Sequence, residues 1–479
     1  MYRINREKLK TYILIILILT SLVQVGILWG YQEHGFPTNF LLTIFKSSEL
    51  SQSEIDRMAR EEFFRPYRLV LSSGDLAHWI IGSGDDIYEK VWSGSKEYIK
   101  NAILSKPQVS TESWDELVTR KGIFLDFKLN VDVNLMKWFL GMGSSSGSGE
   151  GLTGINKVFI IPKDGITTSL DIVYILNEGT VHKYIVNVDN EDLNRETFEK
   201  YLVELEEDTK YEAKKYWVIR EFDPKGRLSF SYSPDIPCVV EMPLEREYST
   251  LNYSIPGKME DKDENELAHL ILANEQYSFD RTIGMDDTVI FKNQNSIYKI
   301  YNDGFMEYTY ISSTGHSDRE DIGKAFSNAY GFISRLGKSL IPKNNIYLSD
   351  VNIKGGGSSF EFTFNYMVDN VPVFIEYNTL FGEKGKISDA IVIEADSRRV
   401  LSCRWLVRDI QKNGKKVRYN VGFNSIDKRV LDETIPGVGD ISVAYVLRSA
   451  GEKELAPSWV IESTTGSRNI LPLLRAEGE

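Results

Sequence analysis

One stretch near the N-terminus sets the strongest limit on how this chain can fold. Residues 11–32 (TYILIILILTSLVQVGILWGYQ) run for 22 positions without a formal charge, and leucine and isoleucine dominate the first half. At about 1.5 Å rise per residue, a helix of this length just crosses a hydrocarbon core of roughly 30 Å. Trp29 and Tyr31 stand at its far end, where amphipathic rings favour the headgroup layer. We therefore predict one transmembrane helix over 11–32.

The flanking residues predict how this helix is oriented. The tip, residues 1–10, has a local charge of +3 from four basic side chains and one acid: Arg3, Arg6, Lys8, Lys10 and Glu7. A positive flank stays in the cytoplasm. A cleaved signal peptide is the alternative, but it would have an apolar core of only about 7–15 residues and a small-x-small cleavage site. Residues 32–37 (QEHGFP) offer no convincing site. We expect an uncleaved, single-pass anchor in the cell membrane, with the bulk of the chain extracytoplasmic.

The anchor also carries groups that favour contact with other helices. Gly26 and Gly30 form a G-x-x-x-G pattern, which lets a second helix approach closely in lipid. Thr20 and Gln24 form an i, i+4 polar pair, and an unpaired amide in hydrocarbon usually finds an interhelical partner. At about 100° per residue the two pairs point roughly 120° apart, which suits two different neighbours. Alternatively, the glycines are ordinary for a membrane helix and Gln24 bonds its own backbone.

Composition limits what the rest of the chain can bind. The length of 479 residues and a hydrophobic fraction of 42% suggest two to four folded domains. The net charge is −13, or −16 without the basic tip. This acidic surface argues against nucleic acid and against adhesion to anionic lipid or wall polymer through bulk charge. Cys238 and Cys403 could form one bridge or could be two buried thiols.

Hydrophobic periodicity predicts an α+β body of antiparallel sheets with packed helices. Helices are expected after a capping box at 51–54, over 85–104, 133–140 and 194–207, and from a capping box at 317–320 to a stop signal at Gly337. Hairpins are expected for 169–176 with 180–188, 216–221 with 227–232, 296–301 with 305–311, and 440–447 with 457–462. A meander should cover 345–353, 359–366, 371–377, 390–394 and 400–407. We divide this body into domains at 33–255, 256–410 and 411–479, the last a β-rich domain or an extension of the second.

Matches to catalytic motifs fail on their context. Residues 143–147 (GSSSG) fit the G-x-S-x-G nucleophile elbow around Ser145, but that motif needs a strand before it and a helix after it. Here the expected order is reversed. Residues 149–154 (GEGLTG) fit a dinucleotide-binding loop and fail for the same reason. The triple glycine at 355–357 lies between two expected strands and is interpreted as a turn or bulge.

Metal sites are not indicated either. None of the five histidines has a metal-binding spacing, and His316 with Glu320 straddles an expected helix cap. Residues 261–272 begin like a calcium loop but have Glu266 where the turn needs glycine and Leu272 where the bidentate glutamate belongs. We therefore expect a protein that is not an enzyme and holds neither a cofactor nor a metal.

The order of apolar signatures resembles the YycH family, whose members are auxiliary proteins of the WalK/WalR (YycG/YycF) two-component system of Gram-positive bacteria. The segments that carry the resemblance are ILWGYQ (27–32), GIFLDFKLNVDVNLMKWFLG (122–141), SIYKIYNDGFMEYTY (296–310), AFSNAYGFISRLG (325–337), FEFTFNYMVDNVPVF (360–374) and DISVAYVLRSAGEKELAPSWVIES (440–463). The last also resembles the closing hairpin of the partner protein YycI.

The resemblance implies a non-enzymatic regulator. Such proteins associate with the sensor histidine kinase WalK and with YycI through transmembrane helices and ectodomains, and they shift kinase signalling in cell-wall homeostasis. The alternative is a membrane-anchored binding module that captures a wall fragment or a peptide, since 25 tyrosines and 8 tryptophans could form an aromatic platform. An anchored hydrolase is the least favoured reading, because no catalytic constellation was found.

Overall fold

The computed structural model describes the following residues: 51–74, 77–143, 151–162, 170–222, 232, 239–241, 245–254, 268, 271, 279–284, 287–311, 320–340, 345–376, 389–422, 437–448, 454–465 and 467–476. The chain divides into two compact units, Met1–Glu54 and Ile55–Glu479. Within the described ranges, no helix is long and apolar enough to span a membrane. The predicted transmembrane helix at 11–32 lies outside those ranges, as do its contact candidates Thr20, Gln24, Gly26 and Gly30.

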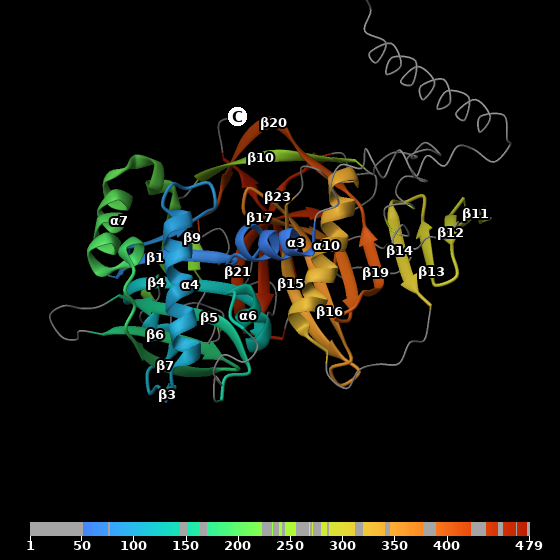
Figure 1. The fold of residues 1–479 in the computed structure, drawn as a ribbon. Helices are drawn as coiled ribbons and strands as arrows, with labels where there is room; N and C mark the ends of the chain where they lie inside the picture. The colour runs from blue at the N-terminus through green and yellow to red at the C-terminus, as the bar shows by residue number, and fades with distance from the viewer. Residues whose placement is uncertain are drawn as a thin grey trace, which may run out of the picture. The chain divides into compact units, whose positions relative to one another are not determined.

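Nine antiparallel strands form a first sheet in the order β3-β7-β6-β5-β4-β1-β2-β8-β9 (Figure 1). The bounds are β1 Arg68–Gly74, β2 Ala77–Ile81, β3 Gln108–Val109, β4 Lys121–Asp132, β5 Gly154–Ile161, β6 Asp171–Asn177, β7 Thr180–Val186, β8 Lys215–Val218 and β9 Val239–Glu241. The predicted hairpin around residues 177–179 is confirmed, because β6 pairs with β7 across that turn.

Three helices of the first-sheet region lie where the sequence predicts them: α4 (Tyr88–Leu104), α6 (Val133–Phe139) and α7 (Arg195–Glu207). The short α5 (Trp114–Leu117) was not predicted. Figure 1 shows α4 lying across the strands, and its apolar face is buried, Val91 and Ile99 completely. The α6 helix begins where the Asp132 carboxylate accepts hydrogen bonds from the amides of Asn134 and Leu135. The α7 helix is capped in the same way by Asn194.

The predicted hairpin of 216–221 with 227–232 is wrong in its first strand. The β8 strand ends at Val218 and a helical turn, α8 (Ile219–Phe222), follows. The Glu221 carboxylate turns back to His78, with Nε2 and Oε2 2.7 Å apart. Ile219 is buried in an apolar cluster with Tyr248. The partners of β8 in the described chain are β2 and β9, because tertiary contacts override the alternating pattern.

Twelve strands form a second sheet, in the order β11-β12-β13-β14-β19-β18-β16-β17-β21-β23-β24, with β15 paired to β16. The bounds are β11 Asp280–Ile283, β12 Val289–Lys292, β13 Ser296–Ile300, β14 Phe305–Tyr310, β15 Asn345–Lys354, β16 Ser359–Val368, β17 Val371–Ile375, β18 Ile391–Ala395, β19 Val400–Leu406, β21 Val438–Leu447, β23 Pro457–Ser463 and β24 Arg468–Pro472. The two remaining hairpins are therefore confirmed, and all five strands predicted for the meander are present. The meander itself is wrong, because β18 pairs with β16 instead of with β17. The pairing of β17 with β21 is parallel.

One long helix, α10 (Ile322–Leu340), packs on the second sheet. Its predicted stripe is buried, with Phe326 and Ala329 fully inaccessible. Its predicted ends are wrong. The helix is capped by the Asp321 carboxylate, which accepts from the amides of Gly323 and Lys324, while Glu320 accepts a hydrogen bond from the amide of Ser397 instead. The helix also passes through Gly337, since one glycine costs only about 1 kcal/mol.

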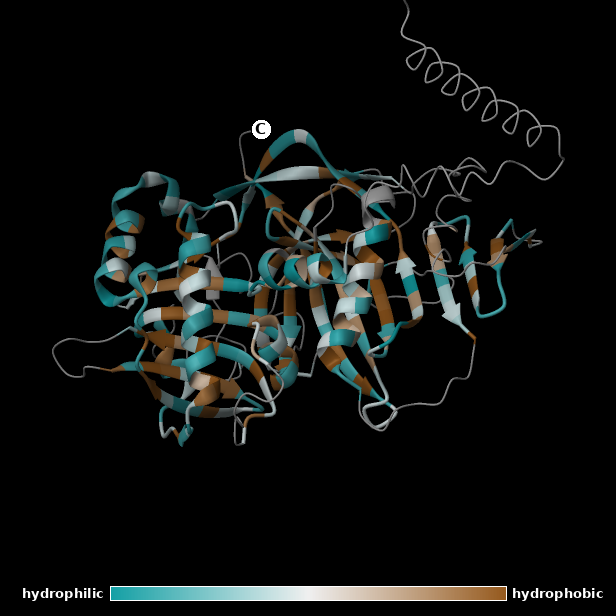
Figure 2. Cartoon of the chain, in the orientation of Figure 1, coloured by the Kyte–Doolittle hydropathy of each residue, from teal (hydrophilic) through white to brown (hydrophobic). Residues whose placement is uncertain are grey.

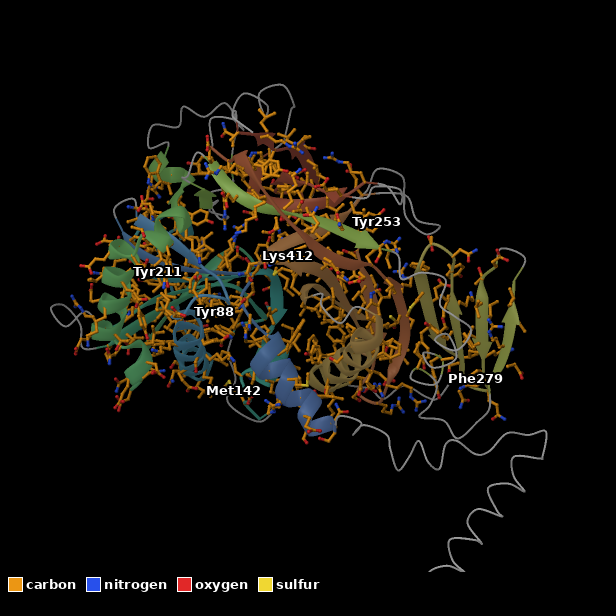
Figure 3. The ribbon with its side chains drawn as sticks, turned by 90° about the horizontal axis from the view of Figure 1, so that it is seen from above. Tyr88, Met142, Tyr211, Tyr253, Phe279 and Lys412 are labelled. Carbon is orange, nitrogen blue, oxygen red and sulfur yellow. The ribbon has the colours of Figure 1, made fainter. Side chains whose placement is uncertain are left out.

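A third sheet has the order β22-β10-β20-β25 and is built from β10 (Glu245–Ser254), β20 (Asp409–Asn420), β22 (Glu454–Leu455) and β25 (Leu474–Arg475). The β10–β20 ribbon joins chain segments on either side of the predicted boundaries at 255 and 410, which stay predictions. In Figure 2 this ribbon is mostly hydrophilic, whereas apolar residues concentrate on the strands of the two larger sheets. Figure 3 shows Lys412 on the ribbon and Tyr88 on the first-sheet side.

Candidate functional site

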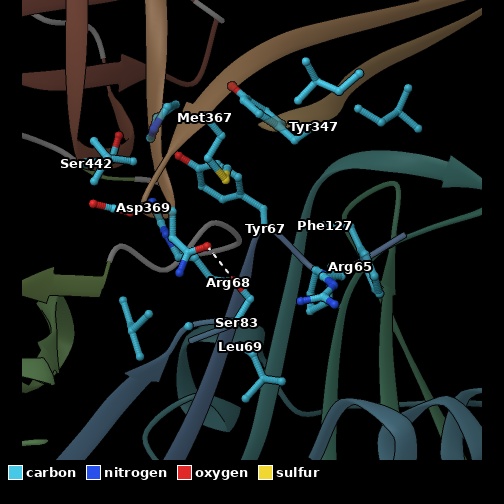
Figure 4. Close-up of a pocket in the computed structure, with 18 of the residues that line it drawn as sticks. Arg65, Tyr67, Arg68, Leu69, Ser83, Phe127, Tyr347, Met367, Asp369 and Ser442 are labelled. Carbon is cyan, nitrogen blue, oxygen red and sulfur yellow. Dashed lines mark hydrogen bonds between the residues drawn. The ribbon is translucent and has the colours of Figure 1, made fainter. Parts of the chain in front are cut away.

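A cavity of about 730 Å³, called the cleft from here on, has walls from both larger sheets and from the third. The first sheet contributes residues of β1, β2, β4 and β8 and the segment that leads into β1. The second sheet contributes β15, β21, β23 and the β16–β17 turn, and β10 and α10 also line the cavity. Figure 4 shows Tyr67 and Tyr347 next to each other in its wall, with ring centroids 5.7 Å apart and ring planes tilted by 46°. Cavities of roughly 300–1,000 Å³ at such junctions are where small ligands usually bind.

Aromatic stacking fixes the segment that leads into β1. The Phe64 ring stacks on Phe139 of α6 at 3.9 Å between centroids and on Phe127 of β4 at 5.5 Å. Pro66 follows and restricts the backbone before Tyr67. This packing holds the residues that line the cleft, Arg65 and Tyr67 among them, on a rigid support.

A buried network of charges, called the ionic network, joins the first sheet to the second behind the cleft. Arg68 of β1 donates to the Asp440 carboxylate of β21 at 2.6 Å, and Asp126 of β4 lies 3.8 Å from the same guanidinium. The Lys128 ammonium of β4 lies 3.0 Å from Glu462 of β23 and 3.9 Å from Asp440. Since the cations stand on one sheet and most of their carboxylates on the other, the network fixes the two sheets to each other.

Electrostatics within the network follows from these distances. Burial alone would raise the pKa of Asp440, and the charges of Arg68 and Lys128 more than offset it, so that the pKa of Asp440 falls to about 2. Burial likewise would raise the pKa of Glu462, but Lys128 and Arg468 bring it below its ordinary value. All these groups are therefore charged at neutral pH.

Lys128 occupies a strained position in β4. Its φ of 63° is uncommon for a residue with a side chain, and it lies in the irregular part of the pairing between β4 and β5. The amide of Lys128 donates to the Asp126 carboxylate at 2.8 Å, and its ammonium lies 4.7 Å from the centre of the Tyr67 ring. The bulge therefore turns a lysine of an interior strand toward Glu462. The sequence signal for it was present but unused: Asp126 and Lys128 interrupt an otherwise apolar run.

The mouth of the cleft is shaped by the β16–β17 turn. Asp369 and Asn370 both have positive φ, 51° and 62°, as in the two-residue turns that match strand twist. The Ser83 hydroxyl donates to the Asn370 side chain at 3.4 Å, a contact drawn in Figure 4. Asp369 lies 2.6 Å from the Lys412 ammonium on β20. The turn thus contacts both the first sheet's loop and the third sheet.

Cations line the same mouth and are held in place by neighbours. Arg65 pairs with Glu89 at 2.7 Å, and Lys214 pairs with Asp85. Arg246 of β10 donates to the Tyr216 hydroxyl at 3.3 Å and lies 5.3 Å from the centre of the Tyr248 ring.

Among the described residues, no arrangement matches any of the catalytic motifs considered in the sequence. They contain no group of three or more His, Cys, Asp or Glu side chains able to hold a metal. Ser145, His316 and residues 261–267 lie outside the described ranges.

Cys403 is a buried free thiol whose pKa is raised by burial, so it packs as a small apolar residue. Cys238 lies outside the described ranges. The triple glycine at 355–357 is a turn, as predicted, with positive φ at all three positions.

Four of the segments that carry the family resemblance, 122–141, 325–337, 360–374 and 440–463, contribute residues to the cleft lining. Residues 122–141 form β4 and α6 and supply Asp126 and Lys128, and residues 440–463 form most of β21 and β23 and supply Asp440 and Glu462. The ionic network therefore lies within two segments that sequence reasoning singled out only for their apolar pattern.

Comparison with known proteins identifies the fold. No family model and no curated protein sequence matches the chain. The crystal structure of YycH from Bacillus subtilis is similar, with a TM-score of 0.51 over 86% of this chain and 96% of that one, at 11% sequence identity. At that identity the similarity bears on the fold, and the chain has a YycH-like fold.

Proposed function

We propose that this protein is a non-enzymatic, membrane-anchored regulator of a WalK-type sensor histidine kinase that acts in cell-wall homeostasis. The observation that carries the proposal is the YycH-like fold, which extends over 86% of this chain and nearly the whole of the similar one. The order of the resembling segments supports it. The proposed partners are the kinase and a YycI-like regulator, contacted through the transmembrane helix and the ectodomain, and no nucleic acid is involved.

Affinity purification of the tagged full-length chain from detergent-solubilised membranes tests this proposal. We expect a sensor histidine kinase and a second single-pass protein to co-purify, as identified by mass spectrometry. A tagged single-pass protein with an unrelated ectodomain is the control. If neither partner is enriched above that control, the regulator proposal is wrong.

The proposed location needs its own test, because it rests on the charge-free run at 11–32 and the basic tip. In intact cells, a cysteine introduced at position 5 should resist an impermeant thiol reagent, while one introduced at position 146 should react. Labelling after permeabilisation controls for access. The reverse pattern would place the body of the chain in the cytoplasm and rule out an extracytoplasmic role.

A second candidate function, an anchored binding module for a wall fragment or a peptide, is favoured by one observation, the cleft. The two functions are compatible, since a regulator can also bind a ligand. They are separated by asking whether kinase output still changes when ligand binding is abolished.

A further inference from the structure

A short helical segment, called the strut from here on, bridges the two larger sheets. It comprises residues 55–64, from the end of α3 (Gln52–Met58) through the single π-turn η1 (Ala59–Phe63). Figure 1 shows α3 between the helices of the first sheet and α10. The strut is the N-terminal end of the compact unit Ile55–Glu479, and residues 33–54 connect it to the predicted membrane helix. A pull on that chain therefore acts on the strut before it acts on either sheet.

Two neighbouring phenylalanines of the strut enter different cores. The Phe63 ring packs on the second-sheet side, with its centroid 4.9 Å from Tyr330 of α10 and 5.9 Å from Phe364 of β16. The Phe64 ring packs on the first-sheet side, 3.9 Å from Phe139 of α6. A single peptide bond thus joins the two cores, and the strut cannot leave one of them without disturbing the other.

The α3 part of the strut is fitted to α10. Ile55 is buried against Gly331, where even a methyl group would lie 3.1 Å from the Ile55 side chain. The Asp56 carboxylate accepts a hydrogen bond from the Ser327 hydroxyl of the same helix. The missing side chain at position 331 therefore makes room for the strut.

The opposite side of the strut contacts the helices of the first sheet. The Arg60 guanidinium lies 4.4 Å from the centre of the Trp138 ring of α6, a distance typical of a cation–π contact. The Arg60 carbonyl accepts a hydrogen bond of 3.3 Å from the Lys96 ammonium of α4. Helices on both sheets thus hold the same short segment.

The strut is also the part of this junction that opens most readily. It is an end segment, and end segments open locally at a lower free energy than interior strands. Its helix changes from α to π at Ala59 and closes with the Phe64 amide 2.9 Å from the Ala59 carbonyl oxygen. Such π-turns are rare and are frequent at functional sites. Its outer side faces solvent, since the Arg57 and Glu61 side chains are 55% and 62% exposed.

We propose that the strut has two positions that control how tightly the two larger sheets are joined. When it is docked, it locks α6 against α10 and forms part of the cleft wall through Met58, Phe63 and Phe64. When it is released, both rings leave their cores, the junction loosens and the cleft opens on that side. The proposal concerns the compact unit alone and does not depend on association with a kinase.

Hydrogen exchange, measured by mass spectrometry on the detergent-solubilised full-length chain, tests this coupling. Gly331→Leu puts a side chain where Ile55 lies and so releases the strut, while leucine favours the α10 helix itself. We expect exchange to accelerate about ten-fold or more at residues 55–64 and in α6, but not in β12 and β13 at the far end of the second sheet. Phe63→Ala should act in the same direction. Arg57→Ala, on the exposed side of the strut, is the control and should leave exchange unchanged.

The coupling must also work in reverse, because coupling between two sites is reciprocal. Asp440→Asn weakens the junction at the ionic network and should accelerate exchange at residues 55–64, whereas Glu247→Gln on the surface should not. Acceleration by Gly331→Leu that stays within residues 55–64 would show a local packing element and overturn the proposal. Uniform acceleration, or a strut that does not respond to Asp440→Asn, would overturn it as well. Co-purification of the kinase is a separate measurement, and its failure would leave these exchange rates unchanged.

Discussion

At the scale of single residues, Asp440 holds together the charges that lie between the two larger sheets. Its carboxylate is 2.6 Å from Arg68 and 3.9 Å from Lys128; the Arg68 side chain is buried, and the Lys128 and Asp440 side chains are only 14% and 15% exposed. Removing one member of a buried ion pair leaves the other charge buried without a partner. This destabilises the folded state far more than replacing both members by apolar residues would.

Asp440→Asn tests this arrangement with little change in shape. We expect the free energy of unfolding to fall by about 3 kcal/mol, toward the lower end for a broken buried pair because Arg68 keeps Asp126 and Lys128 keeps Glu462. Urea denaturation measures it. Glu247→Gln is the control, since Glu247 pairs with Arg418 on the surface and should change stability by less than about 1 kcal/mol. Equal effects of the two variants would contradict a structural role for the ionic network.

The same carboxylate predicts a dependence on pH. The pKa of Asp440 lies near 2 in the folded chain against an ordinary 3.8, so its contribution to stability is present above about pH 4 and is lost as the pH falls through 2. Glu462, also lowered, adds loss in the same direction. Unfolding measured between pH 5 and 2 should therefore show a steeper decline for the parent than for Asp440→Asn. Parallel curves would show that Asp440 does not titrate as proposed.

At the scale of elements, α10 joins parts of the chain that the sequence assigns to different domains. The Phe326 ring lies 4.8 Å from Phe139 of α6 and 5.3 Å from Phe362 of β16, measured between centroids. Glycine at position 323 permits the close approach, because a methyl group there would overlap the Trp138 ring. The helix is therefore packed on the second sheet and against the helix that follows β4.

Phe326→Ala should lower the free energy of unfolding by about 3–5 kcal/mol and reduce protein abundance, since a fully buried ring is replaced by a cavity. Tyr330→Ala should act in the same direction. Lys324→Ala, on the exposed side of the same helix, should remain within about 0.5 kcal/mol of the parent. Denaturation followed by circular dichroism gives all three values. A stable Phe326→Ala protein that fails to bind its partners would identify an interface where we describe a core.

The predicted transmembrane helix is the other element whose contacts are testable. Gly26→Leu and Gln24→Leu both make the segment more apolar, so each variant should remain inserted and abundant. Each should nevertheless weaken cross-linking, and to a different partner, because the glycine pair and the Thr20–Gln24 pair point in different directions. Site-specific cross-linking in membranes measures this. If both variants cross-link and signal like the parent, the helix is only an anchor.

Local features of the fold could be predicted from the sequence, and features that depend on distant partners could not. The capping box at 51–54 formed as predicted, with the Ser51 amide 2.7 Å from the Glu54 carboxylate, because all its atoms lie within one turn. The helix expected from the box at 317–320 begins later, at Ile322 with an Asp321 cap, and the Glu320 carboxylate accepts from the amide of Ser397, 77 positions away. The α8 turn likewise depends on a distant residue, because the Glu221 carboxylate contacts the His78 ring.

At the scale of the whole molecule, the cleft could not be predicted from the sequence, because it depends on contacts between distant parts of the chain. Its walls come from strands separated by hundreds of positions, and β10 pairs with β20 and β22, which lie far along the chain. Alternation predicted each strand but not its neighbour. The resemblance to the YycH family supplied the order of elements and hence the fold, which the similarity to YycH supports. The charged residues within those apolar segments were not recognised as an ionic network.

The bond between Arg68 and Asp440 spans 372 positions, and this bears on when the protein can mature. During synthesis, β1 and β4 emerge long before the strand that neutralises them, so an incomplete chain carries Arg68 and Lys128 without the β21 and β23 carboxylates. Contacts of such separation form late and slowly. A chain that stops before residue 437 lacks β21 and β23 and cannot reach the folded state. The last strands to be synthesised therefore determine whether the rest of the chain folds or is degraded.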